Sequence, residues 1–195
     1  MNTASPRKAV AVALIAATSL APTLGAADPC DTRDANIEYL EPPFSAAQLR
    51  RAMPVGLKVV MQVDSPIAGK FTRQMAVEQS SAQTVSMRET TLEEAFRNAM
   101  PSGTVNASWE ELRDHACFPA AQTKRSRITA NTAFGELSAW RYQFDQDGVR
   151  LVLTFADALP GLPVSYERYE SGILVLASEQ SARSDRPKAR PDPGA

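Results

Sequence analysis

The chain has 195 residues, of which 21 are basic and 22 acidic, giving a formal net charge of −1 at pH 7. A chain of this length suits one globular domain plus a short targeting segment. Its near-neutral charge supplies no field that would draw it onto nucleic acid. After the N-terminal segment, no stretch has the roughly 20 apolar residues that a membrane span needs. We therefore expect no nucleic-acid partner and no membrane-spanning segment.

The N-terminal residues have the pattern of a secretory signal peptide. Arg7 and Lys8 precede an apolar run over residues 9–20, Pro22 breaks the run, and Gly25-Ala26-Ala27 supplies small residues at a cleavage site. We expect residues 1–27 to be removed, with cleavage after Ala26 or Ala27, and the protein to be periplasmic or secreted. The segment holds two of the basic residues and none of the acidic ones, so the remainder carries a net charge of −3.

Two cysteines remain in the mature chain, Cys30 and Cys117. In an oxidising compartment an even pair indicates a disulfide, the alternative being two free thiols. A bond closing a loop of this length would contribute roughly 4–5 kcal/mol. Pro29 directly before Cys30 disfavours acylation of that cysteine as a lipoprotein.

In the first half of the chain, a short helix precedes three strands. Ser45 can cap a helix over residues 46–53, which Pro54 ends. Alternating apolar residues then predict half-buried strands. These strands are expected over residues 55–64, around Phe71, Met75 and Val77, and over residues 83–90. Arg73 interrupts the apolar side of the second strand.

Two capping boxes predict helices in the middle of the chain. Thr91 to Glu94 precedes Leu92, Ala95, Phe96 and Ala99, whose spacing favours a short helix within residues 91–107. Ser108 to Glu111 opens a second helix that reaches about Cys117, and Pro119 ends it.

From residue 127 onward the pattern is that of an antiparallel meander. Five strands are expected, over residues 128–134, 136–145, 149–155, 164–170 and 173–180. Asp147-Gly148 suits a hairpin turn because glycine tolerates positive φ. Residues 181–195 contain no apolar residue larger than alanine, so we expect a disordered tail after a single domain over residues 28–180.

Six apolar side chains on two neighbouring strands of the meander are candidate ligand-lining residues. They are Trp140, Tyr142, Phe144, Leu151, Leu153 and Phe155. The first interpretation is that they form the core beneath the helices. The second is that this face is partly open and holds an acyl chain or another apolar ligand.

We find no catalytic, metal or cofactor motif. His115 is the single histidine, and no Gly-x-Ser-x-Gly elbow accompanies it. Glu93-Glu94 and Glu110-Glu111 are adjacent on expected helices, so neither pair can face itself across a sugar. The nine glycines are scattered among turns and form no phosphate-binding loop. We expect no enzyme activity, no metal and no cofactor.

One part of the chain resembles a known family. Phe134 to Tyr142 reads Phe-Gly-Glu-Leu-Ser-Ala-Trp-Arg-Tyr, and Leu159 to Val164 reads Leu-Pro-Gly-Leu-Pro-Val. This pattern, within residues 126–180, resembles bacterial periplasmic domains related to the lipoprotein-carrier (LolA/LolB-like) half-barrels. The resemblance implies a curved antiparallel sheet whose concave face is plugged by short helices and, in the carriers, holds acyl chains. No ligand-binding motif of the carriers can be matched to a residue here.

We therefore expect an α+β fold, with one curved antiparallel half-barrel sheet of about seven or eight strands and two or three short helices on one face. The function expected is that of an exported, non-enzymatic binding or carrier protein for a lipid-like or other apolar ligand. The alternative is a structural or interaction module of the cell envelope, which would contact an envelope protein through an exposed sheet edge or the tail.

Overall fold

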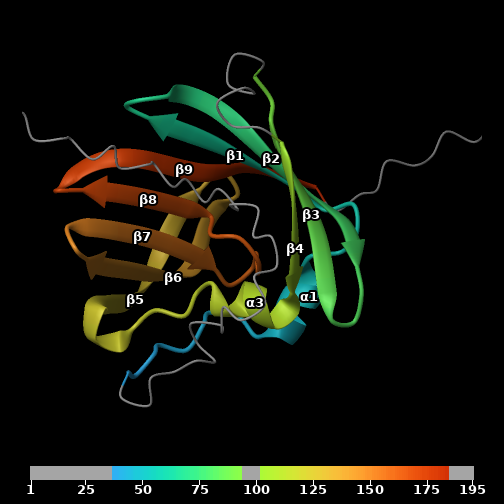
Figure 1. The fold of residues 1–195 in the computed structure, drawn as a ribbon, viewed down its shortest axis with the longest axis horizontal. Coiled ribbons are helices and arrows are strands. Elements are labelled where there is room, and N and C mark those ends of the chain that lie inside the picture. Colours follow the sequence, from blue (N-terminus) through green and yellow to red (C-terminus); the bar gives the residue numbers. More distant parts are fainter. Residues whose placement is uncertain (1–36, 94–101, 185–195) are drawn as a thin grey trace, which may run out of the picture.

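A computed structural model describes residues 37–93 and 102–184. Nine antiparallel strands form one sheet in the order β4-β3-β2-β1-β9-β8-β7-β6-β5. The sheet curves strongly, and helices α1 and α3 lie together at one end of it (Figure 1). The predicted α+β fold with a curved antiparallel sheet is confirmed, with nine strands instead of seven or eight. In the described ranges, no helix has the length and apolarity to span a membrane.

The first meander holds four strands, which are β1 (Lys58–Ser65), β2 (Gly69–Ser80), β3 (Thr84–Thr91) and β4 (Gly103–Ser108). The short helix expected within residues 91–107 falls mostly on residues 94–101, which lie outside the described residues, so it stays a prediction; residues 103–107 of that range belong to β4. Thr91 completes β3, and β4 pairs with β3 from Gly103 onward. The Glu93 carboxylate accepts a hydrogen bond from the Thr72 N–H (2.7 Å), which attaches it to β2.

The second meander holds the five strands that the sequence predicts. They are β5 (Thr123–Thr132), β6 (Gly135–Gln146), β7 (Val149–Ala156), β8 (Ser165–Glu170) and β9 (Ile173–Ser184). Asp147 and Gly148 turn between β6 and β7 with φ of 51° and 78°, as their sequence favours. β5 begins five residues before the predicted start, because its pairing with β6 extends to Thr123 opposite Phe144.

β1 and β9 join the two meanders. They pair antiparallel from Lys58 opposite Ser184 to Asp64 opposite Ala177, with a register shift at Val60/Met61. β9 therefore includes residues 181–184, which the sequence assigned to the tail. The composition of residues 181–184 did not indicate a strand. The strand is stabilised by backbone pairing with β1 and by the Arg183 guanidinium, and composition does not reveal such contacts. That guanidinium donates to the carbonyls of Ala52 (2.6 Å) and Pro160 (3.3 Å).

The predicted N-cap at Ser45 and the predicted capping box at Ser108 are both confirmed, and Ser45 also forms a capping box, with Gln48. Ser45 caps α1 (Ala46–Ala52), and Ser108 caps α3 (Trp109–Asp114). A short 3-10 turn, η1 (Ala120–Gln122), leads into β5. The indole N–H of Trp109 donates to the carbonyl of Ser81 (3.1 Å), which fastens α3 to the β2–β3 hairpin.

The core lies between the helices and one face of the curved sheet. Tyr142 is its centre, with no exposed surface. Its ring lies 5.7 Å from the rings of Phe118 and Phe155, and its hydroxyl donates to the carbonyl of Glu41 (3.0 Å). Burial raises the pKa of Tyr142 to about 12. This one residue thus connects β6, β7 and the segment before α1.

Tyr142→Ala should lower the free energy of unfolding by about 3–5 kcal/mol, because it leaves a cavity among packed rings. Tyr142→Phe should cost only about 1 kcal/mol, the net value of the lost hydrogen bond. Urea unfolding measures both. Tyr169→Ala, on β8 outside the core clusters, is the control and should cost less than about 1 kcal/mol. Equal costs for the Phe and Ala variants would contradict this account of the ring.

Truncation separates β9 from the residues that follow it. A chain ending at Ser184 should keep the unfolding free energy of the full chain. A chain ending at Gln180 should lose about 2–3 kcal/mol, because it loses several net hydrogen bonds to β1 and those of Arg183. Arg183→Ala in the full chain isolates the side-chain part. Equal stability of the two truncated chains would show that residues 181–184 contribute nothing.

Candidate functional site

The two edges of the sheet differ in charge. Edge strand β5 carries Lys124, Arg125 and Arg127. Edge strand β4 reads Gly-Thr-Val-Asn-Ala-Ser, with no charged residue and no proline. Native proteins commonly protect sheet edges with lysine, other charges or proline, because unpaired strand edges accept further strands. Between these two strands, β4 therefore has the unprotected edge.

The hydrogen bonds of β4 show which of its backbone groups face the open edge. The Trp109 N–H donates to the carbonyl of Gln83 (3.0 Å), so the odd-numbered residues in this register face β3. Thr104 and Asn106 then direct their N–H and C=O groups away from the sheet, and no described residue pairs with these groups. The next N–H in phase, that of Ser108, donates to the Glu111 carboxylate (2.5 Å). Two residues of β4 thus present backbone groups to a further strand.

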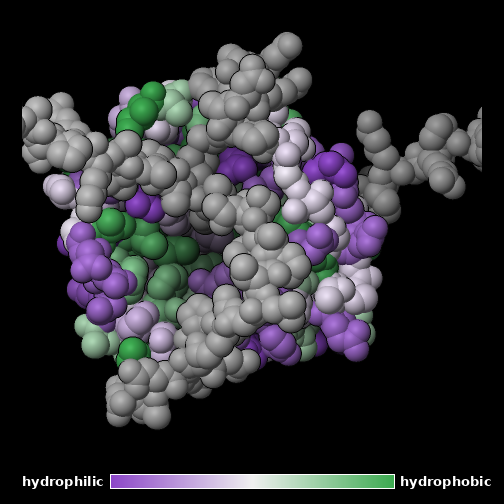
Figure 2. All heavy atoms as spheres, viewed as in Figure 1, coloured by the Kyte–Doolittle hydropathy of each residue, from purple (hydrophilic) through white to green (hydrophobic). Residues whose placement is uncertain are grey.

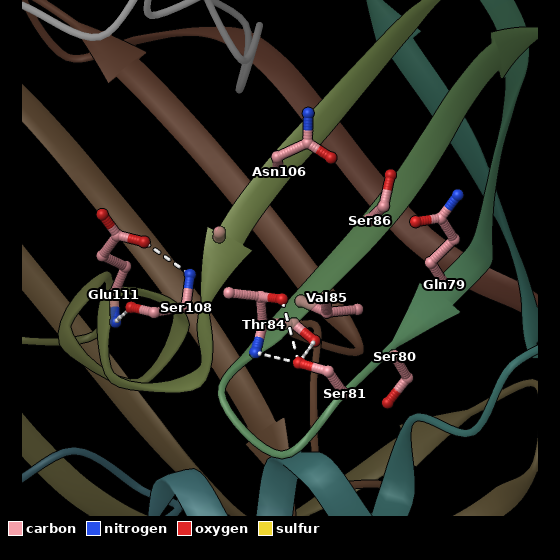
Figure 3. Close-up of a pocket in the computed structure, with 10 residues that line it drawn as sticks. Gln79, Ser80, Ser81, Thr84, Val85, Ser86, Asn106, Ser108 and Glu111 are labelled. Carbon is pink, nitrogen blue, oxygen red and sulfur yellow. Dashed lines mark hydrogen bonds between the residues drawn. The ribbon is translucent and has the colours of Figure 1, made fainter.

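The same alternation gives β4 a core face and a groove face. On the core face, Val105 is half-buried and Ala107 is buried. On the groove face, the exposed side chain of Asn106 lies beside Ser86 of β3, which in turn lies opposite Gln79 of β2. These three side chains project from one face and form a polar row across three strands (Figure 3).

This face is hollowed into a groove of about 420 Å³, which we call the edge groove. Its polar lining residues are Gln79, Ser80, Ser81, Thr84, Ser86, Asn106, Ser108 and Glu111. The hydroxyl of Ser81 accepts the N–H of Thr84 (2.9 Å) and lies 3.0 Å from the Thr84 hydroxyl, which holds the hairpin at the lower end in Figure 3. The hydrogen bond from Ser108 keeps the pKa of Glu111 below its ordinary value. The edge groove therefore offers hydroxyls, amides and one carboxylate.

A second, smaller cavity of about 70 Å³ lies on the core side between the two meanders. Apolar side chains line most of it, including Met61, Val63, Met75, Leu162, Tyr166 and Leu176. Arg73 also projects here, as its place on the apolar side of its strand predicted, and it contacts the Glu89 carboxylate at 2.8 Å. Burial raises the pKa of Glu89, an effect that the positive charge of Arg73 opposes. Figure 2 shows apolar side chains gathered in a hollow over β7 and β8.

The six predicted ligand-lining residues lie together in or against the core. Tyr142, Leu153 and Phe155 are buried core residues. Trp140, Phe144 and Leu151 are half-buried and pack against them. The guanidinium of Arg125 lies 3.8 Å from the centre of the Trp140 ring, and that of Arg127 lies 4.8 Å away. None of the six lines the edge groove or the small cavity, and a ligand-lining role for them stays a prediction.

The other residues that the sequence analysis considered lie near α3. Cys117 follows this helix and is half-buried, whereas Cys30 lies outside the described residues, so the disulfide stays a prediction. His115 is the exposed C-cap of α3. Glu110 forms an ion pair with Arg113 (3.0 Å), while Glu111 caps the helix. Among residues 37–93 and 102–184, no cluster of three His, Cys, Asp or Glu side chains could hold a metal ion.

Sequence reasoning missed the edge groove, because its lining comes from two hairpins and a helix start. Two local signals were present. Residues 79–86 are rich in Gln, Ser and Thr, and residues 102–108 contain no charge and no proline. Taken together with an edge position, these signals would have indicated an unprotected polar edge.

No protein-family model matches this chain. No curated protein matches it significantly in sequence. Among solved structures, MucB has a TM-score of 0.48 at 13% identity, over 75% of this chain and 58% of MucB. MucB in complex with MucA(peri) gives 0.48 at 12% identity, over 72% and 55%. This chain thus spans less than two thirds of MucB.

A protein with a YmcC-like fold from Bacteroides fragilis gives a TM-score of 0.43 at 10% identity, over 68% of this chain and 97% of that protein. At such identities, and with TM-scores below 0.5, these likenesses carry no conclusion about function.

Two carboxylates should affect stability with opposite dependence on pH. The folded pKa of Glu89 lies above the ordinary 4.5, so its contribution is complete below that value and is lost as pH rises through the folded pKa. The folded pKa of Glu111 lies below 4.5, so its contribution is present above 4.5 and is lost as pH falls through the folded pKa.

Urea unfolding from pH 3 to 7 tests this pair. The stability of the native protein relative to Glu89→Gln should decrease as pH rises above about 4.5. Its stability relative to Glu111→Gln should decrease as pH falls below that value. Each variant is the control for the other, and slopes of the same sign would contradict the two environments described.

Proposed function

We propose that this protein is an exported binding module that takes up an extended segment of a partner protein as an additional strand beside β4. The observation that carries the proposal is the outward direction of the Thr104 and Asn106 backbone groups on an edge without charge or proline. Addition of a strand to an open sheet edge is an established mode of peptide recognition, in which main-chain hydrogen bonds supply affinity.

The surroundings of β4 suit such a segment. The edge groove of about 420 Å³ lies on one face of the strand and gives space for side chains. At one end, the bond from the Ser108 N–H to Glu111 and the start of α3 close the edge. A bound segment would therefore pair with a short stretch centred on Val105.

The predicted role as a carrier of a lipid-like ligand has weaker support from the geometry. Pockets for small ligands typically measure about 300–1,000 Å³. The cavity between the meanders measures about 70 Å³, and the Arg73–Glu89 ion pair lies in its wall. An acyl chain in this cavity would require it to widen and would lie close to two charged groups. An extended peptide at β4 would enter the larger edge groove instead.

Site-specific photocrosslinking in cells tests the proposal. Benzoylphenylalanine in place of Thr104 should give a discrete adduct whose partner peptide maps by mass spectrometry to one segment. Adding Asn106→Pro should abolish the adduct, because it removes an outward N–H without altering the bonds between β4 and β3.

The opposite edge supplies the matched control. The Asp157 N–H donates to the carbonyl of Ser138, so the backbone groups of even-numbered residues of β6 face β7, and those of Thr129 on β5 face outward. Benzoylphenylalanine at Thr129 should give no such adduct, and Thr129→Pro should leave the adduct at position 104 intact. An adduct that survives Asn106→Pro, with folding verified by circular dichroism, would exclude strand addition at β4.

A further inference from the structure

We infer that the segment bound at β4 is selected by the phase of its alternation, with polar residues opposite Thr104 and Asn106 and an apolar residue opposite Val105. This inference rests on the proposed function and adds a chemical description of the partner. It concerns a three-residue element, polar–apolar–polar, in an extended conformation.

The direction of the backbone groups fixes this phase. In a β-strand, the residues whose N–H and C=O groups face one neighbour all place their side chains on the same face of the sheet. Thr104 and Asn106 direct their backbone outward and their side chains onto the groove face. Residues of an added strand directly opposite them must place their side chains on that same face. The intervening residue must lie on the core face, next to Val105.

The two faces beside the edge differ in chemistry. On the groove face, an incoming side chain meets the amide of Asn106, with the hydroxyl of Ser86 and the amide of Gln79 behind it. These groups both donate and accept hydrogen bonds, so they suit Ser, Thr, Asn or Gln.

On the core face, an incoming side chain meets Val105, which is half-buried. Behind it lies Met87, which is 3% exposed. An apolar residue there extends the core, whereas a polar or charged one would lose hydration without gaining a partner. A segment in the opposite phase would place apolar side chains on the polar groove face and a polar side chain on the apolar core face.

Binding of two glycine-flanked probes tests the phase. The in-phase probe is Gly-Gly-Thr-Val-Thr-Gly-Gly, and the out-of-phase probe is Gly-Gly-Val-Thr-Val-Gly-Gly, both with blocked termini and a fluorophore. The in-phase probe should bind the full chain about two- to fivefold more tightly, because all three of its cross-strand pairs are matched, whereas the out-of-phase probe matches at most two by shifting its register by one residue. The out-of-phase probe is the more hydrophobic one, so nonspecific attraction would give the opposite order.

Variants of the protein test whether Asn106 causes the preference for the in-phase probe. Asn106→Val should reduce the preference for the in-phase probe or shift it to the out-of-phase probe, because it makes the groove face apolar beside the edge. Thr129→Val on the β5 edge should leave the ratio unchanged. Thermal melts should show that both variants remain folded.

The outcomes separate this inference from the proposed function. Equal binding of the two probes, with both lost in Asn106→Pro, would overturn the phase rule and leave strand addition at β4 standing. Binding of either probe that is unaffected by Asn106→Pro would overturn strand addition itself. Absence of binding by both probes would count against the phase rule, while the photocrosslink at position 104 reports separately on the edge.

Discussion

The pairing of β1 with β9 is the interaction on which the rest of the structure depends. It joins residues 58–64 to residues 177–184, more than 110 positions away, and makes one nine-stranded sheet of two meanders. Each meander alone would expose a long hydrogen-bonding edge and one side of the apolar core. Closing so long a loop costs chain entropy before the contacts form, so this seam should be among the late events of folding.

Contacts around the seam connect it to the helices. Arg183 of β9 binds the end of α1, and the side-chain amide of Gln180 donates to the carbonyls of Leu162 and Pro163, both at 3.1 Å. The loop between β7 and β8 is thereby attached to β9, the strand that pairs with β1. Since the seam leaves β4 and β5 as the two outer strands, it also determines which backbone groups stay available at the edges.

Much of the fold could be predicted from local patterns. The five-strand meander follows from alternation and turn residues, α1 follows from the N-cap at Ser45, and α3 follows from the capping box at Ser108. β4 was not predicted, because its Thr, Asn and Ser residues give little apolar alternation and the segment before it has helical spacing. Residues 181–184 were not predicted either, since their place in β9 depends on a distant strand and on Arg183. Composition and spacing do not encode such contacts.

The candidate site was harder to predict than the fold for the same reason. The six side chains chosen from the sequence are large and mostly apolar, and hydrophobicity indicates burial more directly than binding. The edge groove is instead made of small polar residues that are individually common on protein surfaces. Only the register of three strands brings Gln79, Ser86 and Asn106 into one row.

The charges of β5 have a consequence for assembly. A strand added to β4 becomes the new outer strand, so in principle growth could continue. If β5 of a second copy could occupy β4 of the first, each copy would offer the next a binding edge, and an open filament would result. Lys124, Arg125 and Arg127 make β5 a poor match for an uncharged edge. Under the proposed function, the protein would have one accepting edge at β4 and one edge at β5 that stops propagation, so it would bind a foreign strand without polymerising.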